Sequence, residues 1–399
     1  MPGRRPRVVL VGPSKRFLGG ITYYTYGLGG ALAATCDLSV LLIRKLVPVW
    51  LYPGGRRVGQ ALSSISLPDG VAIFDGLDYS WGLSAVRARR WLRSQKPDVI
   101  VLQWWSATVL HSYLLLSAIG RRFGAHVVVE FHESLDPGEQ RYRLLAAYVR
   151  RAAPWLFSHC AAFVVHSESD RALVTARFHI DPNLVRVIPH AVYEHQVRGP
   201  KRRVAPDGVC NLLFFGLIRP VKGLDDLVSA LDRLGDDEAK NYWLTIVGET
   251  WEHCEPIVEM ARSSRHPERV TIVNRYVSDE EADGFFRGAD VVVLPYRSAS
   301  QSGVLHMAMG YGLPVVVTRV GGLAEDAVGY DGGVVVEPRS PTALLDGIRV
   351  ARTMTPSSSS SGLRWADSAR AYGVLFDQLL RRPPPGVDAT DPAGLGSAA

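Results

Sequence analysis

The sequence predicts an α/β protein built from two tandem doubly wound, Rossmann-like domains that face each other across a cleft. Its 399 residues exceed the length of one ordinary domain. Short apolar runs alternate with helical stretches in both halves, which is typical of parallel sheets covered by helices. Between the halves, residues 196–208 are rich in proline, glycine and basic residues, as in a linker. Ligands of such folds bind at the carboxyl ends of the strands.

In the first half, apolar runs predict six strands and a helix over Ile21–Ala34. The predicted strands are Arg7–Val11, Leu38–Ile43, Asp98–Gln103, Val127–Glu130, Ala161–Val165 and Val185–Ile188. The longest apolar stretch, Val99–Gly120, is interrupted by Gln103, His111 and serines, so we expect a buried strand and a buried helix there instead of a membrane span.

In the second half, the same alternation predicts six more strands. They are Asn211–Phe215, Tyr242–Val247, Val270–Val273, Val291–Leu294, Val315–Thr318 and Gly333–Val336. The resulting divisions are a first domain over 1–195, a linker over 196–208, a second domain over 209–362, a helix over 363–381 and a disordered tail over 382–399. The last helix carries Trp365, Ala369, Tyr372 and Phe376 on one face.

Two basic residues follow the first strand of the second half. That strand ends at Gly216, and a short loop then presents Arg219 and Lys222 before a helix that opens near Gly223. Two cations three residues apart at the carboxyl end of a strand can bind a diphosphate. The alternative is a basic loop exposed to solvent.

Two glycine-containing turns add candidate anion sites. Ser302 and Gly303 begin a helix, whose first amides and dipole favour an anion, and Gly303 allows a phosphate to approach the backbone. Gly19 and Gly20 follow the first strand and resemble the turn of a nucleotide-binding unit, although two glycines alone are weak evidence. An ordinary capped helix is the alternative for Ser302.

These segments together resemble the retaining nucleotide-sugar glycosyltransferases of family 4, which have the GT-B fold. The resemblance covers about residues 7–380, and its second-domain part matches in order and spacing. The matching segments are Gly19–Gly20, Phe131–Glu133, Val164–Ser167, Val187–Ala191, Phe215–Gly223, Leu244–Gly248, Ala289–Tyr296, Ser302–Gly303, Gly312–Val316, Gly321–Glu325 and Arg364–Trp365. The last of these resembles the helix that returns to the first domain.

The resemblance implies an enzyme that moves a sugar from a nucleoside diphosphate donor to a hydroxyl acceptor with retention of configuration. Glycan, glycolipid or glycosylated-metabolite biosynthesis would be its setting. The implied catalytic residues are Arg219, Lys222 and His132. The implied diphosphate site comprises Gly19, Gly20, Arg219, Lys222, Ser302, Gly303 and Val304. The implied nucleoside site comprises Gly216, Val277 and Tyr296, and the acceptor side comprises His132 and Glu133. A satisfied structural histidine is the alternative for His132.

One departure from the family concerns two glutamates eight residues apart, the second of which holds the donor ribose. Registering Gly312–Pro314 on the family pattern places Ala299 and Met307 at those positions. The Ser-Gly-Val form of this segment is similar to a subgroup that lacks both glutamates. We therefore expect an altered donor site and not an inactive enzyme.

Metal and cofactor requirements are expected to be absent. Asp225–Asp226 and Asp236–Asp237 lie outside the strand ends, so neither pair forms a convincing metal motif, and the donor is a substrate. No carboxylate pair stands out for glycosidase chemistry. A sugar-nucleotide epimerase and a non-catalytic sugar-nucleotide-binding protein remain as alternatives. Loops such as Arg44–Leu67 and Asp75–Gly82 are expected to select the acceptor.

Charge and cysteine usage suggest the compartment and a further partner. Four distant cysteines and no secretory signal suit a reducing cytoplasm. Residues 1–195 carry a net charge of +10 and residues 196–399 carry −4. This basic half favours an anionic membrane surface, at the inner face of the cell membrane, over nucleic acid. The candidate contacts are Arg87, Arg89, Arg90, Arg93, Arg150 and Arg151, and a solvated helix face is the alternative.

Overall fold

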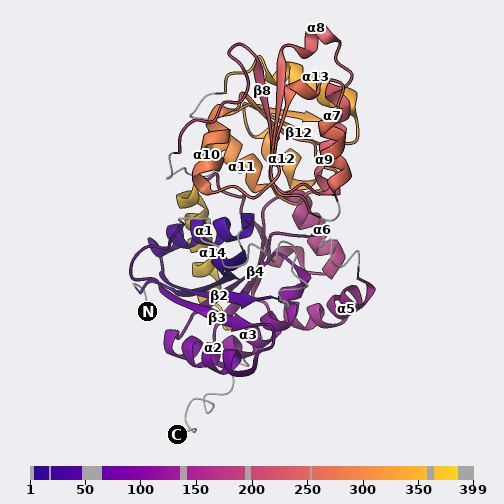
Figure 1. Ribbon diagram of the computed structural model, residues 1–399. Coiled ribbons are helices and arrows are strands. Elements are labelled where there is room, and N and C mark those ends of the chain that lie inside the picture. Colours follow the sequence, from indigo (N-terminus) through magenta and orange to yellow (C-terminus); the bar gives the residue numbers. More distant parts are fainter. Residues whose placement is uncertain are drawn as a thin grey trace, which may run out of the picture.

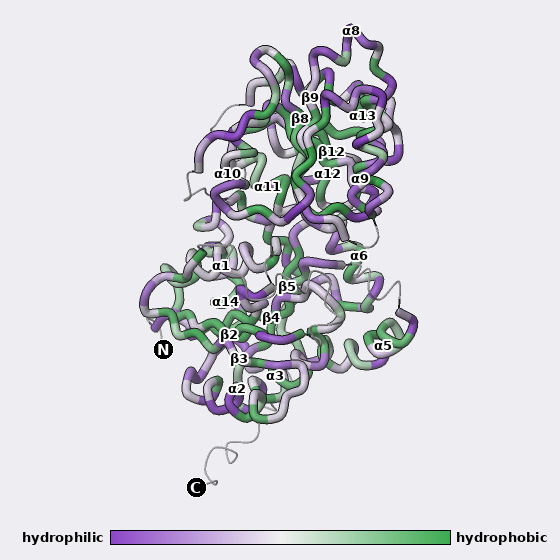
Figure 2. The backbone as a smooth tube through the Cα atoms, in the orientation of Figure 1, coloured by the Kyte–Doolittle hydropathy of each residue, from purple (hydrophilic) through white to green (hydrophobic). Residues whose placement is uncertain are grey.

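A computed structural model of the protein describes residues 4–17, 19–46, 65–134, 142–193, 199–251, 254–356 and 364–384. The chain forms two α/β domains, one above the other in Figure 1, each with its own parallel sheet. The predicted fold class is therefore confirmed. Figure 2 shows the most hydrophobic segments along the strands in the middle of each domain, which is the pattern of strands buried on both faces.

The first sheet has seven parallel strands. They are β1 (Arg7–Pro13), β2 (Asp37–Lys45), β3 (Ala72–Asp78), β4 (Val99–Trp104), β5 (His126–Phe131), β6 (Ala162–Val165) and β7 (Val185–Val187). Their order across the sheet is β3-β2-β1-β4-β5-β6-β7. The sequence missed β3, where we expected a loop over Asp75–Gly82. This strand lies at the edge of the sheet and is only partly buried, and its apolar run, Val71–Phe74, is followed directly by Asp75 and Gly76. Most of the expected loop Arg44–Leu67 lies outside the described residues.

Helices cover both faces of this sheet. They are α1 (Gly20–Ala33), α2 (Gly82–Gln95), α3 (Leu110–Arg122), α5 (Arg143–Phe157), α6 (Glu168–Phe178) and α14 (Trp365–Leu380). Alternate strand residues point to opposite faces. Val9 and Val11 accordingly pack with the core under α2, α3 and α5, whereas Val8 and Leu10 pack with α1 and α14.

The second sheet has six parallel strands in the order β10-β9-β8-β11-β12-β13. They are β8 (Cys210–Phe215), β9 (Tyr242–Val247), β10 (Val270–Val273), β11 (Val291–Leu294), β12 (Val315–Thr318) and β13 (Gly333–Val336). The helices around it are α7 (Leu224–Leu231), α8 (Asp236–Ala239), α9 (Glu255–Arg262), α10 (Asp279–Gly288), α11 (Gly303–Gly310), α12 (Gly321–Val328) and α13 (Pro341–Ala351). All six strands occupy the predicted segments, because each is a short and largely apolar run, and β10 to β13 are also rich in β-branched residues.

The segments between domains have distinct environments. Residues 199–208 of the expected linker run along the second domain, where the Gly199 amide donates to Asp283 and the Arg202 amide donates to the carbonyl oxygen of Gly284. Helix α14 returns from the second domain and packs on α1. The expected linker residues 196–198, the serine run within 357–363 and the tail residues 385–399 lie outside the described part of the chain.

The described helices include none that is both long and apolar enough to cross a membrane. The apolar stretch Val99–Gly120 forms β4 and most of α3, both buried in the first domain.

Candidate active site in the interdomain cleft

A cleft of about 1040 Å³ lies between the two domains and is lined by residues of both. It opens where the loops that follow the strands of the second sheet meet the start of α1, as expected for doubly wound domains. Every residue predicted for the donor diphosphate and nucleoside lines it: Gly19, Gly20, Gly216, Arg219, Lys222, Val277, Tyr296, Ser302, Gly303 and Val304. The fold therefore brings together positions that are nearly 300 residues apart in sequence.

The loop after β8 depends on glycines that allow close backbone packing. Gly223 has a φ of +65°, and a Cβ there would lie 2.0 Å from the carbonyl oxygen of Pro295. A Cβ on Gly248 would lie 1.7 Å from the carbonyl oxygen of Gly216. Only glycine fits such contacts. The loops after β8, β9 and β11 are thus packed against one another at one edge of the sheet.

Lys222 is held at the cleft by an aromatic side chain. It ends the short 3-10 helix Pro220–Lys222, and its Nζ lies 3.5 Å from the ring centroid of the buried Tyr296, a cation–π contact. The neighbouring Arg297 binds Asp225 at 2.7 Å and Asp226 at 2.8 Å. These two carboxylates are therefore engaged by Arg297, and they raise the pKa of its guanidinium through hydrogen bonds that outweigh desolvation.

The amino end of α11 supplies the amide side of the site. Ser302 caps the helix, since its Oγ accepts a hydrogen bond from the Leu305 amide at 3.3 Å. The first-turn amides of Gly303 and Val304 have no acceptor within their own helix. A Cβ on Gly303 would lie 3.9 Å from the Cα of Gly20, so the two predicted glycine turns face each other across the cleft.

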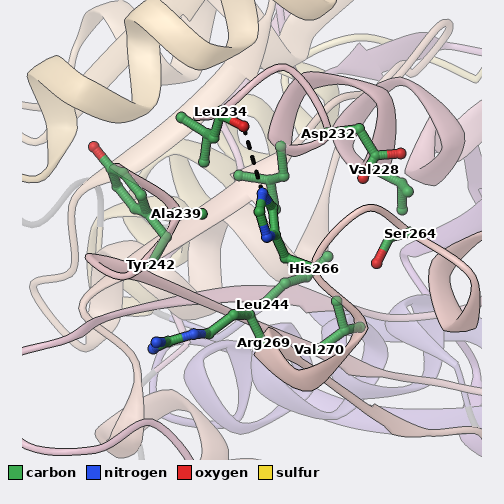
Figure 3. Close-up of a pocket in the computed structure, with 11 residues that line it drawn as sticks. Val228, Asp232, Leu234, Ala239, Tyr242, Leu244, Ser264, His266, Arg269 and Val270 are labelled. Carbon is green, nitrogen blue, oxygen red and sulfur yellow. Dashed lines mark hydrogen bonds between the residues drawn. The ribbon is translucent and has the colours of Figure 1, made fainter. Parts of the chain in front are cut away.

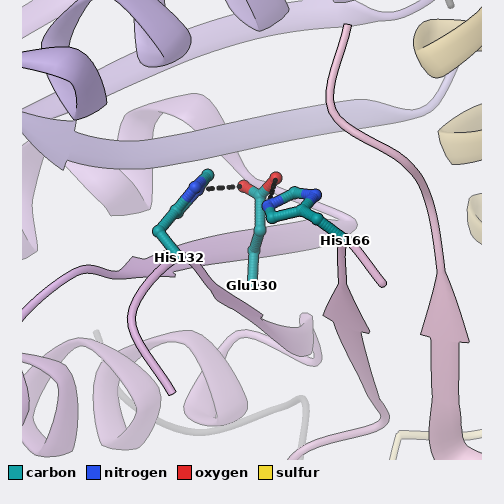
Figure 4. A group of neighbouring side chains, drawn as sticks. All are labelled: Glu130, His132 and His166. Atoms are coloured by element: carbon teal, nitrogen blue, oxygen red, sulfur yellow. Dashed lines mark ion pairs between the residues drawn. The ribbon is translucent and has the colours of Figure 1, made fainter. Parts of the chain in front are cut away.

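His132 and Glu133, predicted on the acceptor side, are not among the described residues that line this cleft. His132 belongs instead to a buried group on the first sheet with Glu130 and His166 (Figure 4). Its Nε2 lies 3.5 Å from Glu130 Oε2, and His166 Nε2 lies 3.7 Å from Glu130 Oε1. Glu133 is partly buried, and its amide donates to the carbonyl of Trp104 at 3.3 Å. The acceptor-side role of His132 and Glu133 therefore stays a prediction.

Glu130 is the centre of that group, although it lies fully buried. Its carboxylate accepts hydrogen bonds from Tyr24 Oη at 2.6 Å, Tyr372 Oη at 2.6 Å and Gln103 Nε2 at 3.0 Å. Burial favours a higher pKa, but His132, His166 and the hydrogen bond from Tyr24 lower the pKa of Glu130 to about 2. The network joins α1, β4, β5 and α14, and we did not foresee it from the sequence.

A histidine stack joins the domains beside this group. The rings of His190 and His306 lie 4.1 Å apart, and His306 Nε2 lies 3.4 Å from Asp326 Oδ2. Burial lowers the pKa of His306 to about 4 and raises the pKa of Asp326 to about 8. A neutral imidazole thus faces a carboxyl group that is mostly protonated at neutral pH.

A carboxylate completes the contact between domains at α6. Glu325 of α12 accepts the Glu168 amide at 2.9 Å and the Ser169 amide at 2.8 Å. An acid at a helix amino terminus is favourable because it offsets unpaired amides and the helix dipole.

Residues 19–191 match the family model for a glycosyl transferase 4-like domain, and residues 210–351 match the model for glycosyl transferases group 1. The chain belongs to the glycosyltransferases with the GT-B fold. A glycogen synthase of Mycobacterium tuberculosis strain H37Rv is 25% identical over 280 residues, which are 69% of this chain and 61% of that protein. The matched region thus spans about three fifths of that relative.

Solved structures of two further proteins share the fold. Sucrose-phosphate synthase from Thermosynechococcus elongatus has a TM-score of 0.72 at 18% identity, over 95% of this chain and 100% of that one. Anabaena HepE in complex with UDP-glucose has a TM-score of 0.59 at 14% identity, over 94% of this chain and 98% of that one.

In this glycosyltransferase, the two positions registered on the family's glutamates have different environments. Met307 lines the cleft beside Gly303, so an apolar side chain is present where the resemblance implies a ribose contact. Ala299 packs with the apolar residues around β11 and β12. At the position of the family's second glutamate, the cleft therefore presents the apolar side chain of Met307 in place of a carboxylate.

The donor atoms of Glu130, His132 and His166 lie within 4.8 Å of one another, and the group is the one candidate metal-ligand set found among the described residues. Two imidazoles and a carboxylate are chemically suitable ligands for zinc. However, Glu130 already accepts hydrogen bonds from three donors. Such bonds can stabilise a buried carboxylate without a bound cation. We interpret the group as structural.

A separate hollow of about 30 Å³ lies in the second domain near α7 and β9 (Figure 3). It is lined largely by aliphatic side chains, and His266 Nε2 lies 3.4 Å from the carbonyl oxygen of Leu234 at its wall. A hollow of this size holds about one water molecule. It is too small for a nucleotide or a sugar.

Proposed function

We propose that this protein transfers a sugar from a nucleoside diphosphate sugar to a hydroxyl acceptor, with retention and without a metal ion. The acceptor hydroxyl belongs to a glycan, a glycolipid or a metabolite. One observation carries the proposal: the cleft gathers Arg219, Lys222 and the first amides of α11 along one wall. Cations and helix amides on one wall suit a diphosphate. HepE, of the same fold, was solved with UDP-glucose.

Catalysis in this proposal comes from stabilising the leaving diphosphate. Negative charge develops on the diphosphate as the bond between sugar and phosphate breaks. Arg219, Lys222 and the amides of Gly303 and Val304 would take up that charge, and because they are preorganised they need little rearrangement. Gly19 and Gly20 would approach the same diphosphate from the first domain. Gly216, Val277 and Tyr296 would border the nucleoside.

The carboxylates that line the cleft support this route over nucleophilic or metal-assisted chemistry. Among the described lining residues they are Glu249, Asp279 and Asp283. Glu249 accepts the Trp251 indole at 2.9 Å, Asp279 accepts Tyr23 Oη, and Asp283 accepts Tyr311 Oη at 2.7 Å. Each of the three thus has a structural partner, which does not favour a nucleophile and acid pair or a metal site.

The test is incubation of the purified protein with a panel of nucleotide sugars, followed by analysis of the products. Slow release of free sugar and nucleoside diphosphate is expected for one donor, because transferases hydrolyse their donors without acceptor. The configuration of the released sugar reports retention, and turnover in EDTA reports metal independence. An isomerised nucleotide sugar would mark an epimerase, and binding without turnover would mark a non-catalytic protein. Either result would overturn the proposal.

A further inference from the structure

The outer face of the first domain carries more than half of the large apolar side chains that are exposed among the described residues. Eleven large apolar side chains are exposed among the described residues. Six of them lie on α2, on α5 or at Tyr142, which immediately precedes α5: Leu83, Val86, Tyr142, Leu144, Tyr148 and Trp155. Helices α2 and α5 both pack against α3, so α3 lies between them and all three cover one face of the sheet (Figure 1). Clustered exposed apolar groups mark interaction surfaces.

Helix α5 has apolar side chains on two sides, one packed in the domain core and the other exposed to solvent. Val149, Ala153, Leu156 and Phe157 point into the core. On the opposite side Leu144 is 87% exposed, Trp155 44% and Tyr148 38%. At 3.6 residues per turn these three project within about 40° of one another. They form an apolar stripe, which we define as Leu144, Tyr148 and Trp155.

The charge around the apolar stripe has one sign. Helix α2 carries four arginines, α3 two and α5 three, and none of these helices contains Asp or Glu. On α5 the exposed Arg151 projects beside the apolar stripe, whereas the exposed Arg143 and Arg150 project about 100° or more to one side of it. Arg87, Arg89, Arg90 and Arg93 are exposed on α2. Aromatic and aliphatic groups bordered by arginines are the composition of helices that lie in a membrane interface.

We propose that α2, α3 and α5 form a docking surface for a bilayer containing anionic phospholipid. The apolar stripe enters the headgroup region, and the surrounding arginines bind lipid phosphates. An anionic bilayer is the partner that satisfies both features, because nucleic acid would match the arginines but leave Leu144 and Trp155 exposed to water. This inference goes beyond the transfer reaction and uses no residue of the cleft.

Sedimentation with vesicles tests the surface. Wild-type protein is expected to bind vesicles of phosphatidylcholine with one quarter phosphatidylglycerol, to bind pure phosphatidylcholine weakly, and to be released as salt rises. Arg150→Glu with Arg151→Glu should lower the partition coefficient by roughly fivefold or more per residue. Leu144→Ser with Trp155→Ser should lower it at least tenfold. The matched control is Val328→Ser, an exposed apolar residue of the second domain.

Fluorescence locates the apolar stripe in the bilayer. Brominated anionic lipid should quench tryptophan emission of the wild type, and Trp155→Leu should keep vesicle binding while losing most of that quenching. The proposal would be overturned if the Leu144→Ser, Trp155→Ser variant bound vesicles as the wild type does. It would also be overturned if duplex DNA displaced the wild-type protein from vesicles and the same double substitution left DNA binding unchanged. Donor hydrolysis in solution should remain as in the wild type for these variants, so failure here is distinguishable from failure of the proposed transfer reaction.

Discussion

The two domains contribute to the interdomain region in opposite ways. In the second domain, Arg219 and Lys222 lie on a short loop directly after a strand and are partly exposed to the cleft. In the first domain, Glu130 and His166 are fully buried, and Glu130 is bound by side chains from α1, β4 and α14. Charge exposed to a cleft can serve a ligand, whereas buried and saturated charge serves the fold. We therefore propose that the second domain binds the donor and that the Glu130 group is structural.

The largest expected effect is the loss of turnover when a basic residue of the cleft, Lys222 or Arg219, is removed. Lys222→Ala should lower donor turnover by roughly 10²–10³-fold, because a preorganised charge on the leaving group is lost. Arg219→Ala should behave similarly. The stability of both variants should stay close to that of the wild type. Lys240→Ala, an exposed lysine of the same domain paired with Asp237, is the control and should keep full turnover. Equal turnover of Lys222→Ala and the control would remove Lys222 from the site.

A pair of glycine substitutions separates ligand approach from folding. A Cβ at Gly303 makes only an ordinary contact of 3.5 Å with Tyr193, so Gly303→Val should fold while its side chain crowds the cleft. Turnover should fall by roughly 10²-fold, as for a misplaced substrate. Gly223→Ala should instead lower the melting temperature, since a positive φ and the Pro295 carbonyl oppose a side chain. Full activity of Gly303→Val would exclude α11 from the diphosphate site.

Glu130→Gln tests whether the buried Glu130 network stabilises the first domain. The amide cannot accept from both tyrosines and Gln103 as the carboxylate does, so a buried donor is left unsatisfied. The free energy of unfolding should fall by about 2–3 kcal/mol in urea titrations. The exposed Glu337→Gln serves as the control and should change it by less than about 0.5 kcal/mol. If the two variants are equally stable, the Glu130 network contributes nothing to the fold.

The cleft residues that the donor site requires could be predicted from the sequence, whereas the Glu130 network could not, and the reason is physical. Donor-side residues are local, because each lies in the loop or helix start that directly follows a strand, so the strand and the candidate residues appear together in the sequence. The Glu130 network joins Tyr24, Gln103 and Tyr372, which are far apart in the chain and meet only in the folded domain. His132 follows β5 just as a cleft residue would, so its contact with Glu130 was not predictable. Edge strand β3 was missed because it is half exposed.

A smaller effect is expected from pH. The pKa of His166 and of His306 is lowered to about 4, chiefly by burial, so between pH 6.5 and 4 the unfolded chain binds more protons than the folded one. Their contribution to stability falls as pH falls through that range. Asp326, with a pKa raised to about 8, acts with the opposite sign, and its contribution is lost as pH rises toward 8.

Stability should therefore be greatest near pH 6.5 and change by roughly 1 kcal/mol per pH unit on either side. Urea titrations at pH 5, 6.5 and 8 measure this. Asp326→Asn cannot ionise, so it should remove the loss between pH 6.5 and 8 and make the loss toward pH 5 steeper, because Asp326 no longer offsets the histidines there. An unchanged alkaline slope in that variant would show that Asp326 is not the group responsible.

The most direct test of the account is calorimetric titration of nucleoside diphosphates into the wild type, Arg219→Ala and Lys222→Ala. If the second-domain wall of the cleft binds the donor diphosphate, the wild type should show one site per chain and a preference for one base. Both variants should remain folded and bind at least tenfold more weakly. Equal affinity in all three proteins would contradict this binding site.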